Sequence, residues 1–219
     1  MMNISEKKRL YTTTELLSMG ATYYEIEKMV NALIKDKQED IVELRDAERL
    51  EKRFLDHPAL AIEQVKAAIY SMAGLACESI RESLNLFENF SEEGFNRVVD
   101  LEEIIDTYED KVGNYLVEIM KRALSDEQNK TVSLFLHSVN DYERLGDHAK
   151  NLAESAREVS NKKIDFSKDA EDEMKNLFAA IREILANTEN AFVKDDIESA
   201  YKIEPLEELI DNLCDTYKR

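Results

Sequence analysis

The chain has 219 residues, enough for one large or two small domains, and its 43% hydrophobic and 35% charged content is that of a folded protein. Five glycines, two prolines and no tryptophan supply few of the residues that the turns of an all-β fold need. The 29 basic and 47 acidic residues give a net charge of −18, which repels nucleic-acid backbones and anionic membrane surfaces. The composition therefore disfavours nucleic-acid binding.

The chain also lacks the signals of a membrane-spanning or exported protein. No apolar run approaches the roughly 18 residues that a transmembrane helix needs, and no signal peptide opens the sequence. Cys77 and Cys214 stand alone on helical patterns without a CxxC spacing, which predicts buried, reduced thiols. We therefore expect a soluble, cytoplasmic molecule.

Helical periodicity covers nearly the whole chain, and three long helices are predicted at residues 62–87, 92–124 and 129–159. Ser91 marks the turn between the first two helices. The Ser-Asp-Glu segment that starts at Ser125 stops the second helix and offers capping groups to the third. Three antiparallel helices of this length predict a three-helix bundle.

After a polar stretch the pattern resumes, with helices predicted at residues 169–192 and 195–219. Pro205 is expected to kink or restart the last helix. This second unit lacks a third helix, so the chain looks truncated. We assign residues 57–161 to a complete first bundle and residues 162–219 to an incomplete second one.

Residues 1–56 are predicted to form a helical hairpin that carries a degenerate copy of the same repeat. Glu48 occupies the place of a first carboxylate in this copy, but Lys52 stands where the second should be. The hairpin is therefore expected to pack structurally and to hold no metal. His57 precedes Pro58, which disfavours helical geometry in the residue before it, so we expect His57 to be a loop or capping residue.

A Glu-x-x-x-Asp pattern occurs three times among apolar residues. Residues four apart share one face of a helix, so each copy presents two carboxylates to one spot beside a buried stripe. The third copy repeats the first almost letter for letter, which indicates internal duplication. The three pairs are Glu102 with Asp106, Glu143 with Asp147, and Glu207 with Asp211.

Paired carboxylates of this kind favour a metal site. If the second and third helices are antiparallel neighbours, four carboxylates converge and supply hard oxygen ligands for iron, manganese, magnesium or calcium. His148 follows Asp147 directly and points about 100° away around the helix, so we expect an exposed residue or an indirect role. Gly146 costs the helix roughly 1 kcal/mol, which a close helix contact or room for a metal cluster would offset.

A plainer interpretation remains open for the same residues. Acidic side chains are abundant in this chain, so any one pair could be a solvated helix face. Arg144 could also neutralise a neighbouring carboxylate through a salt bridge.

These motifs carry a family resemblance. Tyr-Glu-Arg-Leu-Gly-Asp-His-Ala at residues 142–149, Leu-Glu-Glu-Ile-Ile-Asp at 101–106 and the close copy at 206–211 resemble the paired acidic signature of PhoU proteins. The likeness covers roughly residues 62–219. The segment 53–66 is similar, more narrowly, to the junction ahead of the PhoU-like cytosolic region in bacterial sodium/phosphate cotransporters.

The resemblance implies paired three-helix bundles that bind multinuclear iron or zinc clusters, with manganese as an alternative, and that restrain phosphate uptake and its signalling. It assigns one cluster site to the first bundle and half of another to the incomplete second bundle. The ligands would be Glu102, Asp106, Glu143 and Asp147 for the first, and Glu207 and Asp211 for the second.

The resulting hypothesis is a non-enzymatic regulatory domain of phosphate transport and homeostasis that acts by protein contact. Its partner would be a phosphate-transport membrane protein or the membrane domain of its own transporter, on the cytosolic face of the inner membrane. The unfinished apolar face of residues 169–219 predicts a homodimer.

Two other classes stay open. A metal-free helical adaptor would need only the bundle itself. A carboxylate-bridged di-metal protein of the ferritin-like type would need Glu-x-x-His pairs. The residues three positions before the histidines are apolar, which weakens this second class: Phe54, Leu134 and Leu145 precede His57, His137 and His148.

Overall fold

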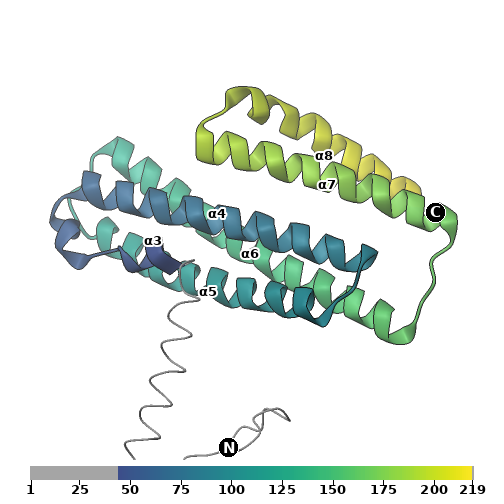
Figure 1. Ribbon diagram of the computed structural model, residues 1–219. Helices are drawn as coiled ribbons and strands as arrows, with labels where there is room; N and C mark the ends of the chain where they lie inside the picture. The colour runs from purple at the N-terminus through teal and green to yellow at the C-terminus, as the bar shows by residue number, and fades with distance from the viewer. Residues whose placement is uncertain (1–43, 219) are drawn as a thin grey trace, which may run out of the picture. The chain divides into compact units, whose positions relative to one another are not determined.

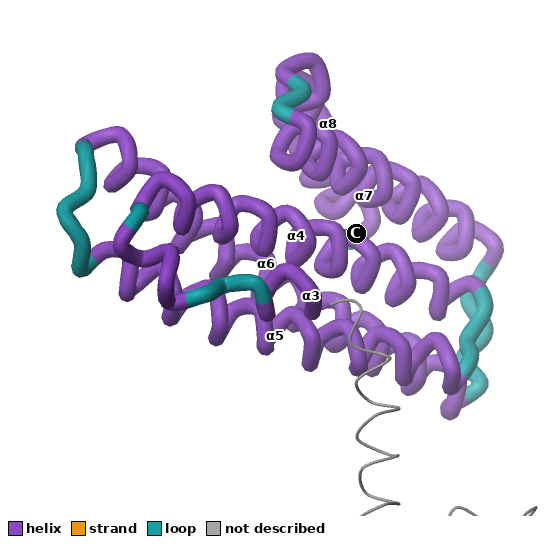
Figure 2. The backbone as a smooth tube through the Cα atoms, turned by 60° about the vertical axis from the view of Figure 1, so that its left-hand side comes forward, coloured by secondary structure: helices purple, strands orange, loops and turns teal. Residues whose placement is uncertain are grey.

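The computed structural model describes residues 44–218, and within this range the regular structure is helical, without a strand. Figure 2 shows that short loops join the long helices. The predicted all-α fold of antiparallel helices is confirmed, whereas most of the predicted hairpin at residues 1–56 lies outside the described residues. The elements labelled in Figure 1 are α3 (Arg45–Glu48), the 3-10 helix η2 (Lys52–Asp56), α4 (Pro58–Glu88), α5 (Glu92–Met120), α6 (Asp126–Lys162), α7 (Lys168–Lys194) and α8 (Ile197–Tyr217).

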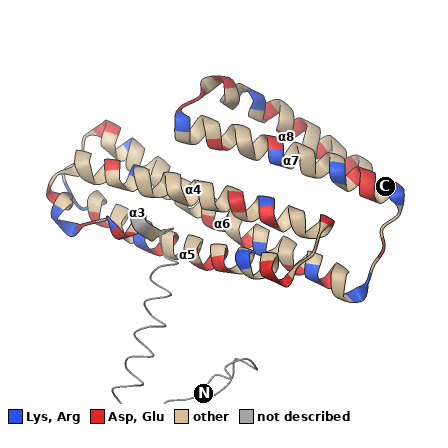
Figure 3. Cartoon of the chain, in the orientation of Figure 1, with Lys and Arg blue, Asp and Glu red and all other residues tan. Residues whose placement is uncertain are grey.

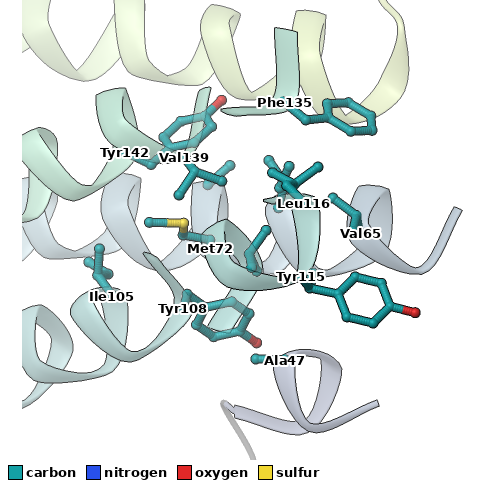
Figure 4. Close-up of a cluster of buried hydrophobic side chains, with 14 of the residues drawn as sticks. Ala47, Val65, Met72, Ile105, Tyr108, Tyr115, Leu116, Phe135, Val139 and Tyr142 are labelled. Carbon is teal, nitrogen blue, oxygen red and sulfur yellow. The ribbon is translucent and has the colours of Figure 1, made fainter. Parts of the chain in front are cut away.

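Helices α4, α5 and α6 each contact the other two and form the predicted three-helix bundle. Consecutive helices run antiparallel (Figure 1). Figure 4 shows side chains from all three helices meeting in the centre, among them Met72, Ile105 and Val139. Burial of apolar surface is the dominant favourable term in folding, and it fixes which face of each helix turns inward. The largest fully buried side chains include Ile69, Met72, Leu84, Leu101, Ile105, Tyr108, Leu116 and Ile119.

Serine side chains cap the second and third helices of the bundle. Ser91 Oγ accepts the Gly94 amide at 3.0 Å where α5 begins. Ser125 Oγ accepts the Gln128 amide at 3.2 Å, and Gln128 Oε1 accepts the Ser125 amide at 3.0 Å, which is a complete capping box. The box starts α6 at Asp126 rather than at residue 129. Because the chain must extend into this cap, α5 ends earlier than the predicted residue 124.

The described residues ahead of α4 differ from the predicted hairpin, which extended to residue 56. Helix α3 ends at Glu48, and Glu51 adopts an extended backbone before η2. Tertiary packing is the reason, because Ala47 and Leu55 are buried against the bundle core. The Tyr115 hydroxyl also donates to the Glu51 carbonyl at 2.9 Å. This short segment therefore covers part of α4 and α5.

Helices α7 and α8 form a hairpin that contacts the bundle, chiefly through α4. The ring of Phe192 on α7 lies edge-on to the rings of Tyr70 and Tyr142, with centroids 5.4 and 5.5 Å apart. Arg81 on α4 pairs with Glu189 on α7 at 2.6 Å. Both predicted helices are present, and the division into repeats at residue 161 stays a prediction.

Pro205 was expected to kink or restart the last helix; a restart is wrong, because α8 contains Pro205 in its interior, and the kink stays a prediction. Proline removes the hydrogen bond to the carbonyl four residues earlier, which here belongs to Tyr201. Tyr201 is 79% exposed, so water can satisfy that carbonyl. Exposure of this helix face explains why the helix continues.

The hydropathy of the helices and the distribution of charged residues agree with what the composition predicts. None of the helices in the described range is long and apolar enough to cross a membrane. Figure 3 shows acidic positions along the long helices, with basic positions between them. Cys77 is buried as predicted, which raises the pKa of its thiol to about 11, whereas Cys214 is only half-buried.

Candidate functional site

The first acidic pair lies on α5 beside the buried stripe. Leu101 and Ile105 are fully buried and fix the rotation of the helix. Glu102, next to them, is only 7% exposed, whereas Asp106 is exposed. A carboxylate as buried as Glu102 is costly without a charged or hydrogen-bonding partner. Glu102 is therefore the most constrained carboxylate of the pair.

The second acidic pair lies on α6, where this helix lies close to α5. Glu143 is half-buried and Asp147 is exposed. A Cβ atom added to Gly146, between them, would lie 3.2 Å from Ile105 Cδ1 and 3.3 Å from Ile105 Cγ2. A close helix contact, one of the two explanations offered for this glycine, is confirmed. It places the α5 and α6 motifs side by side.

The two pairs repel one another across the helix boundary. Burial, followed by the charges of Glu102 and Asp147, raises the pKa of Asp106 above its ordinary value of 3.8. Burial, followed by Asp147 and Asp106, raises the pKa of Glu143 above its ordinary value of 4.5. Glu109, one turn after Asp106, contributes to both shifts, and the sequence pattern missed it because it falls outside the Glu-x-x-x-Asp spacing. The structure thus brings the four predicted carboxylates together.

Lys150 supplies positive charge to this surface and was also missed in the sequence. Its Nζ donates to Glu102 Oε1 at 2.6 Å across the α5–α6 boundary. This hydrogen bond is the largest cause that raises the pKa of Lys150. Lys150 lies one turn after Asp147 on the same helix face, and this spacing is the sequence feature that could have identified it. The charge of Arg144 lowers the pKa of Glu143, after the larger effects that raise it, whereas Lys150 forms the ion pair with Glu102.

The donor chemistry of the site suits a metal ion, but the present arrangement does not. Carboxylate oxygens are accepted ligands of iron, zinc and manganese. Within residues 44–218, however, no group of three or more His, Cys, Asp or Glu side chains is placed so that it could hold a metal ion. The carboxylates are close enough to repel one another without surrounding one point, and Lys150 holds Glu102. Metal binding therefore stays a prediction.

The other predicted site residues do not join this surface. Glu207 and Asp211 are both exposed on α8, which contacts α7 rather than a second acidic helix in the described range. His148 is exposed, as its position after Asp147 predicted. His57 is the exposed N-cap residue of α4 and makes no side-chain cap, and His137 is exposed on α6.

The repulsion predicts a distinctive pH dependence for the metal-free protein. A carboxylate whose pKa is raised by folding binds more protons in the folded state, so its contribution to the free energy of unfolding falls as the pH rises through that pKa. Glu143→Gln should therefore stabilise the protein at neutral pH. The gain should shrink as the pH falls towards 4.5, the ordinary value for glutamate. Urea unfolding in chelator at several pH values measures both effects.

The control for this prediction is Glu103→Gln, which changes an exposed carboxylate on α5. Removal of a general excess of negative charge would give the same gain at both positions. Equal gains, or a gain from Glu143→Gln that does not depend on pH, would contradict the local repulsion. Added salt should reduce the gain, because the site is partly exposed.

The part of the chain that carries the acidic pairs of the bundle is similar to known proteins. Residues 69–156, which include α5 and both acidic pairs of the bundle, match the family model described as PhoU domain. The "Phosphate-specific transport system accessory protein PhoU homolog 1" of Thermotoga maritima is 25% identical over 150 residues, which cover 68% of this chain and 64% of that protein. The "Phosphate-specific transport system accessory protein PhoU homolog" of Clostridium acetobutylicum is 22% identical over 160 residues, 72% of this chain and 70% of that protein.

The match therefore spans less than two thirds of the Thermotoga maritima protein. No solved structure matches the chain significantly.

Proposed function

From the match of residues 69–156 to the PhoU domain, we propose that this chain is a member of the PhoU family and that it regulates phosphate transport as an accessory component. The domain match is the observation that carries the proposal, and the names of the two relatives support it. The mode of action is protein contact rather than catalysis. The chain docks from the cytoplasmic side on a membrane protein of phosphate transport, and a sodium/phosphate cotransporter is one such partner.

Exposed apolar side chains on α8 support a protein partner. Ile197, Tyr201 and Leu209 are large hydrophobic side chains that remain exposed on this one helix. Apolar side chains gathered on one surface commonly mark contact sites. A homodimer is the form that we propose for the free protein.

Metal binding is the finer part of the proposal. Burial raises the pKa of Asp106 and Glu143, and repulsion between the carboxylates adds to it; a cation would relieve this repulsion. Iron or zinc, with manganese as the alternative, would neutralise this surface and tie α5 to α6. The proposed ligands are Glu102, Asp106, Glu143 and Asp147 for one site, and Glu207 with Asp211 for half of another.

A metal-free helical adaptor is the second candidate, and one observation favours it. The Glu102–Lys150 ion pair already neutralises the most buried carboxylate without any metal. Such a protein would use the same bundle as a docking surface. The metal content of the protein distinguishes the two candidates.

The test uses cells that lack the chain, complemented with wild type, with Glu143→Ala/Asp147→Ala, or with Glu207→Ala/Asp211→Ala. Without the chain, phosphate uptake should no longer fall when phosphate is plentiful, and wild type should restore the response. The purified wild-type protein should contain stoichiometric metal by elemental mass spectrometry. The first double variant should lose it, and the second, with the same spacing on exposed positions of α8, should keep the metal of the bundle.

Each outcome separates one part of the proposal from the others. Uptake that is equally responsive with and without the chain would contradict the regulatory function. A restored response by a wild-type protein that contains no metal would leave the function in place and favour the adaptor.

A further inference from the structure

A groove lies between the segment ahead of α4 and the C-terminal part of α5, away from the acidic pairs. We propose that this groove is the docking site for an acidic, amphipathic segment of the protein partner. The inference rests on the proposed action by protein contact, and it assigns a surface and a partner chemistry to that contact.

The groove is formed by two parts of the chain that are far apart in the sequence. Its volume is about 1180 Å³, and its two walls come from residues 47–55 and residues 111–122. Figure 4 shows Ala47 of the first wall below Tyr115 of the second. The Tyr115 hydroxyl holds the first wall in place, because it donates to the Glu51 carbonyl at 2.9 Å. The groove is therefore already formed in the free chain, which lowers the cost of binding.

The charge of the groove is opposite to that of the whole chain. Four basic and two acidic side chains line it, whereas the complete sequence has 29 basic and 47 acidic residues. Such a local reversal of charge attracts a partner of opposite sign and orients it. An acidic partner is therefore the complementary one. The basic side chains are all exposed, and they belong to Lys52, Lys111, Lys121 and Arg122.

Most of this positive charge is not used up by pairing within the described range. Lys121 pairs with Glu118. This hydrogen bond is the largest cause that lowers the pKa of Glu118, and the charges of Arg122 and Lys52 lower it further. Positive charge from both walls therefore reaches the same point. Within residues 44–218, no ion pair is formed by Lys52, Lys111 or Arg122, so these side chains can meet the carboxylates of a partner.

The groove is also lined by apolar side chains, so a partner that offers only carboxylates would not be complementary. Ala47, Leu50, Leu55 and Val117 contribute to the lining, and Val117 is 46% exposed. Exposed ion pairs alone stabilise a complex only weakly, whereas burial of apolar surface contributes strongly. A helix that places its apolar face in the groove and its acidic residues along the edges uses both features.

A small molecule or a membrane surface fits this groove less well. The groove is open to solvent, so a small ligand would keep much of its surface in water, unlike a ligand in a typical pocket. A lipid bilayer would meet the exposed basic side chains without reaching Leu55 and Tyr115, which are buried in the lining. A protein segment can contact both the basic and the apolar parts.

The first experiment selects phage-displayed random peptides of about 16 residues, roughly four helical turns, on the purified full chain. Because the net charge of the chain is −18, non-specific binding would favour basic peptides. Binding in the groove should instead enrich peptides that combine Asp and Glu with Leu, Ile or Phe. Enrichment of basic peptides, or of none, would contradict the proposal.

The most enriched acidic peptide is then labelled with fluorescein, and its binding to the full chain is measured by fluorescence anisotropy. Lys52→Gln/Arg122→Gln should weaken binding about tenfold, and added salt should weaken binding to wild type. Val117→Ala should weaken binding about fivefold, because it removes apolar surface from the groove.

The matched control is Lys168→Gln/Lys175→Gln, which removes the same charge from exposed positions of α7. This control should bind the peptide as wild type does, and circular dichroism shows that each variant is folded. Equal binding by wild type and Lys52→Gln/Arg122→Gln would mean that the peptide binds elsewhere, and the groove would not be the docking site.

The lipid alternative is tested with vesicles of phosphatidylcholine and phosphatidylserine in equal parts. The full chain should stay in the supernatant when the vesicles are sedimented. Sedimentation with the vesicles that is lost in Lys52→Gln/Arg122→Gln would assign the groove to a membrane surface and overturn the protein partner.

Complementation of cells that lack the chain separates this inference from the function on which it rests. Lys52→Gln/Arg122→Gln should restore less of the uptake response to phosphate than wild type or the α7 control. If all three restore it equally, the regulatory function stands and the groove is not its contact surface. If uptake responds equally with and without the chain, the regulatory function fails, whereas loss of peptide binding in the groove variant would still support the groove as a site for an acidic segment.

Discussion

Ile105→Ala is expected to lower the free energy of unfolding by about 2–5 kcal/mol, the range for truncation of a fully buried isoleucine. Ile105 is 0% exposed, and its side chain reaches α6 at Gly146. The change removes apolar contacts and leaves a cavity between helices that pack tightly here. Urea unfolding followed by far-UV circular dichroism measures the loss.

Two further variants show whether the loss reflects the site. Ile105→Val removes only the Cδ1 atom and should cost about 0.5–1.5 kcal/mol. Val117→Ala, on the same helix at a position that is 46% exposed, should change the free energy of unfolding by less than about 0.5 kcal/mol. Equal effects of Ile105→Ala and Val117→Ala would mean that α5 does not pack as described.

Gly146→Val is expected to destabilise the protein by about 1–3 kcal/mol, the usual cost of extra atoms in a well-packed region. Even a bare Cβ atom would lie 3.2 Å from Ile105 Cδ1, and valine adds two methyl groups beyond it. The helices would have to separate at the level of the acidic motifs. Metal affinity, where present, should fall along with the stability, and both are measured on the same preparation.

The matched control is Gly113→Ala on α5, where an added Cβ meets no atom within 4 Å. Alanine there should stabilise the protein by about 0.5–1 kcal/mol, because glycine is a poor helix former. Gly146→Ala should give no such gain. In a protein that already carries Ile105→Val, Gly146→Ala should show part of the gain, because the closest atom has been removed. A gain of the same size at both glycines would overturn the close-contact explanation of Gly146.

The sequence predicted those features that depend on local periodicity and on short spacings. The helices of the bundle, the turn at Ser91, the capping segment at Ser125 and the close approach at Gly146, one of two explanations offered for that glycine, follow from patterns within about one turn of helix. The gathering of two acidic pairs followed from the antiparallel arrangement of α5 and α6, which short connections favour.

The sequence did not predict the features that depend on contacts between distant elements. Lys150 on α6 contacts Glu102 on α5, and many lysines of this chain have similar neighbours in the sequence, so the pattern does not single Lys150 out. The chain after Glu48 leaves helical geometry because Leu55 and the Tyr115 hydrogen bond give it better packing. The helix continues through Pro205 because the carbonyl that loses its hydrogen bond is exposed to water, and the sequence alone does not indicate this exposure.

The contact between Ile105 and Gly146 sets a requirement for any helix that covers α8. Ile210 has, in the repeated segment, the place that Ile105 has in α5. A helix that packs on α8 in the same register therefore needs glycine, or at most alanine, opposite Ile210. A larger residue would hold the two backbones apart and keep Glu207 and Asp211 from sharing an ion with it. A glycine or alanine followed directly by an acidic residue is thus the sequence pattern by which a helix that fits α8 can be searched for, in a second copy of the chain or in another protein.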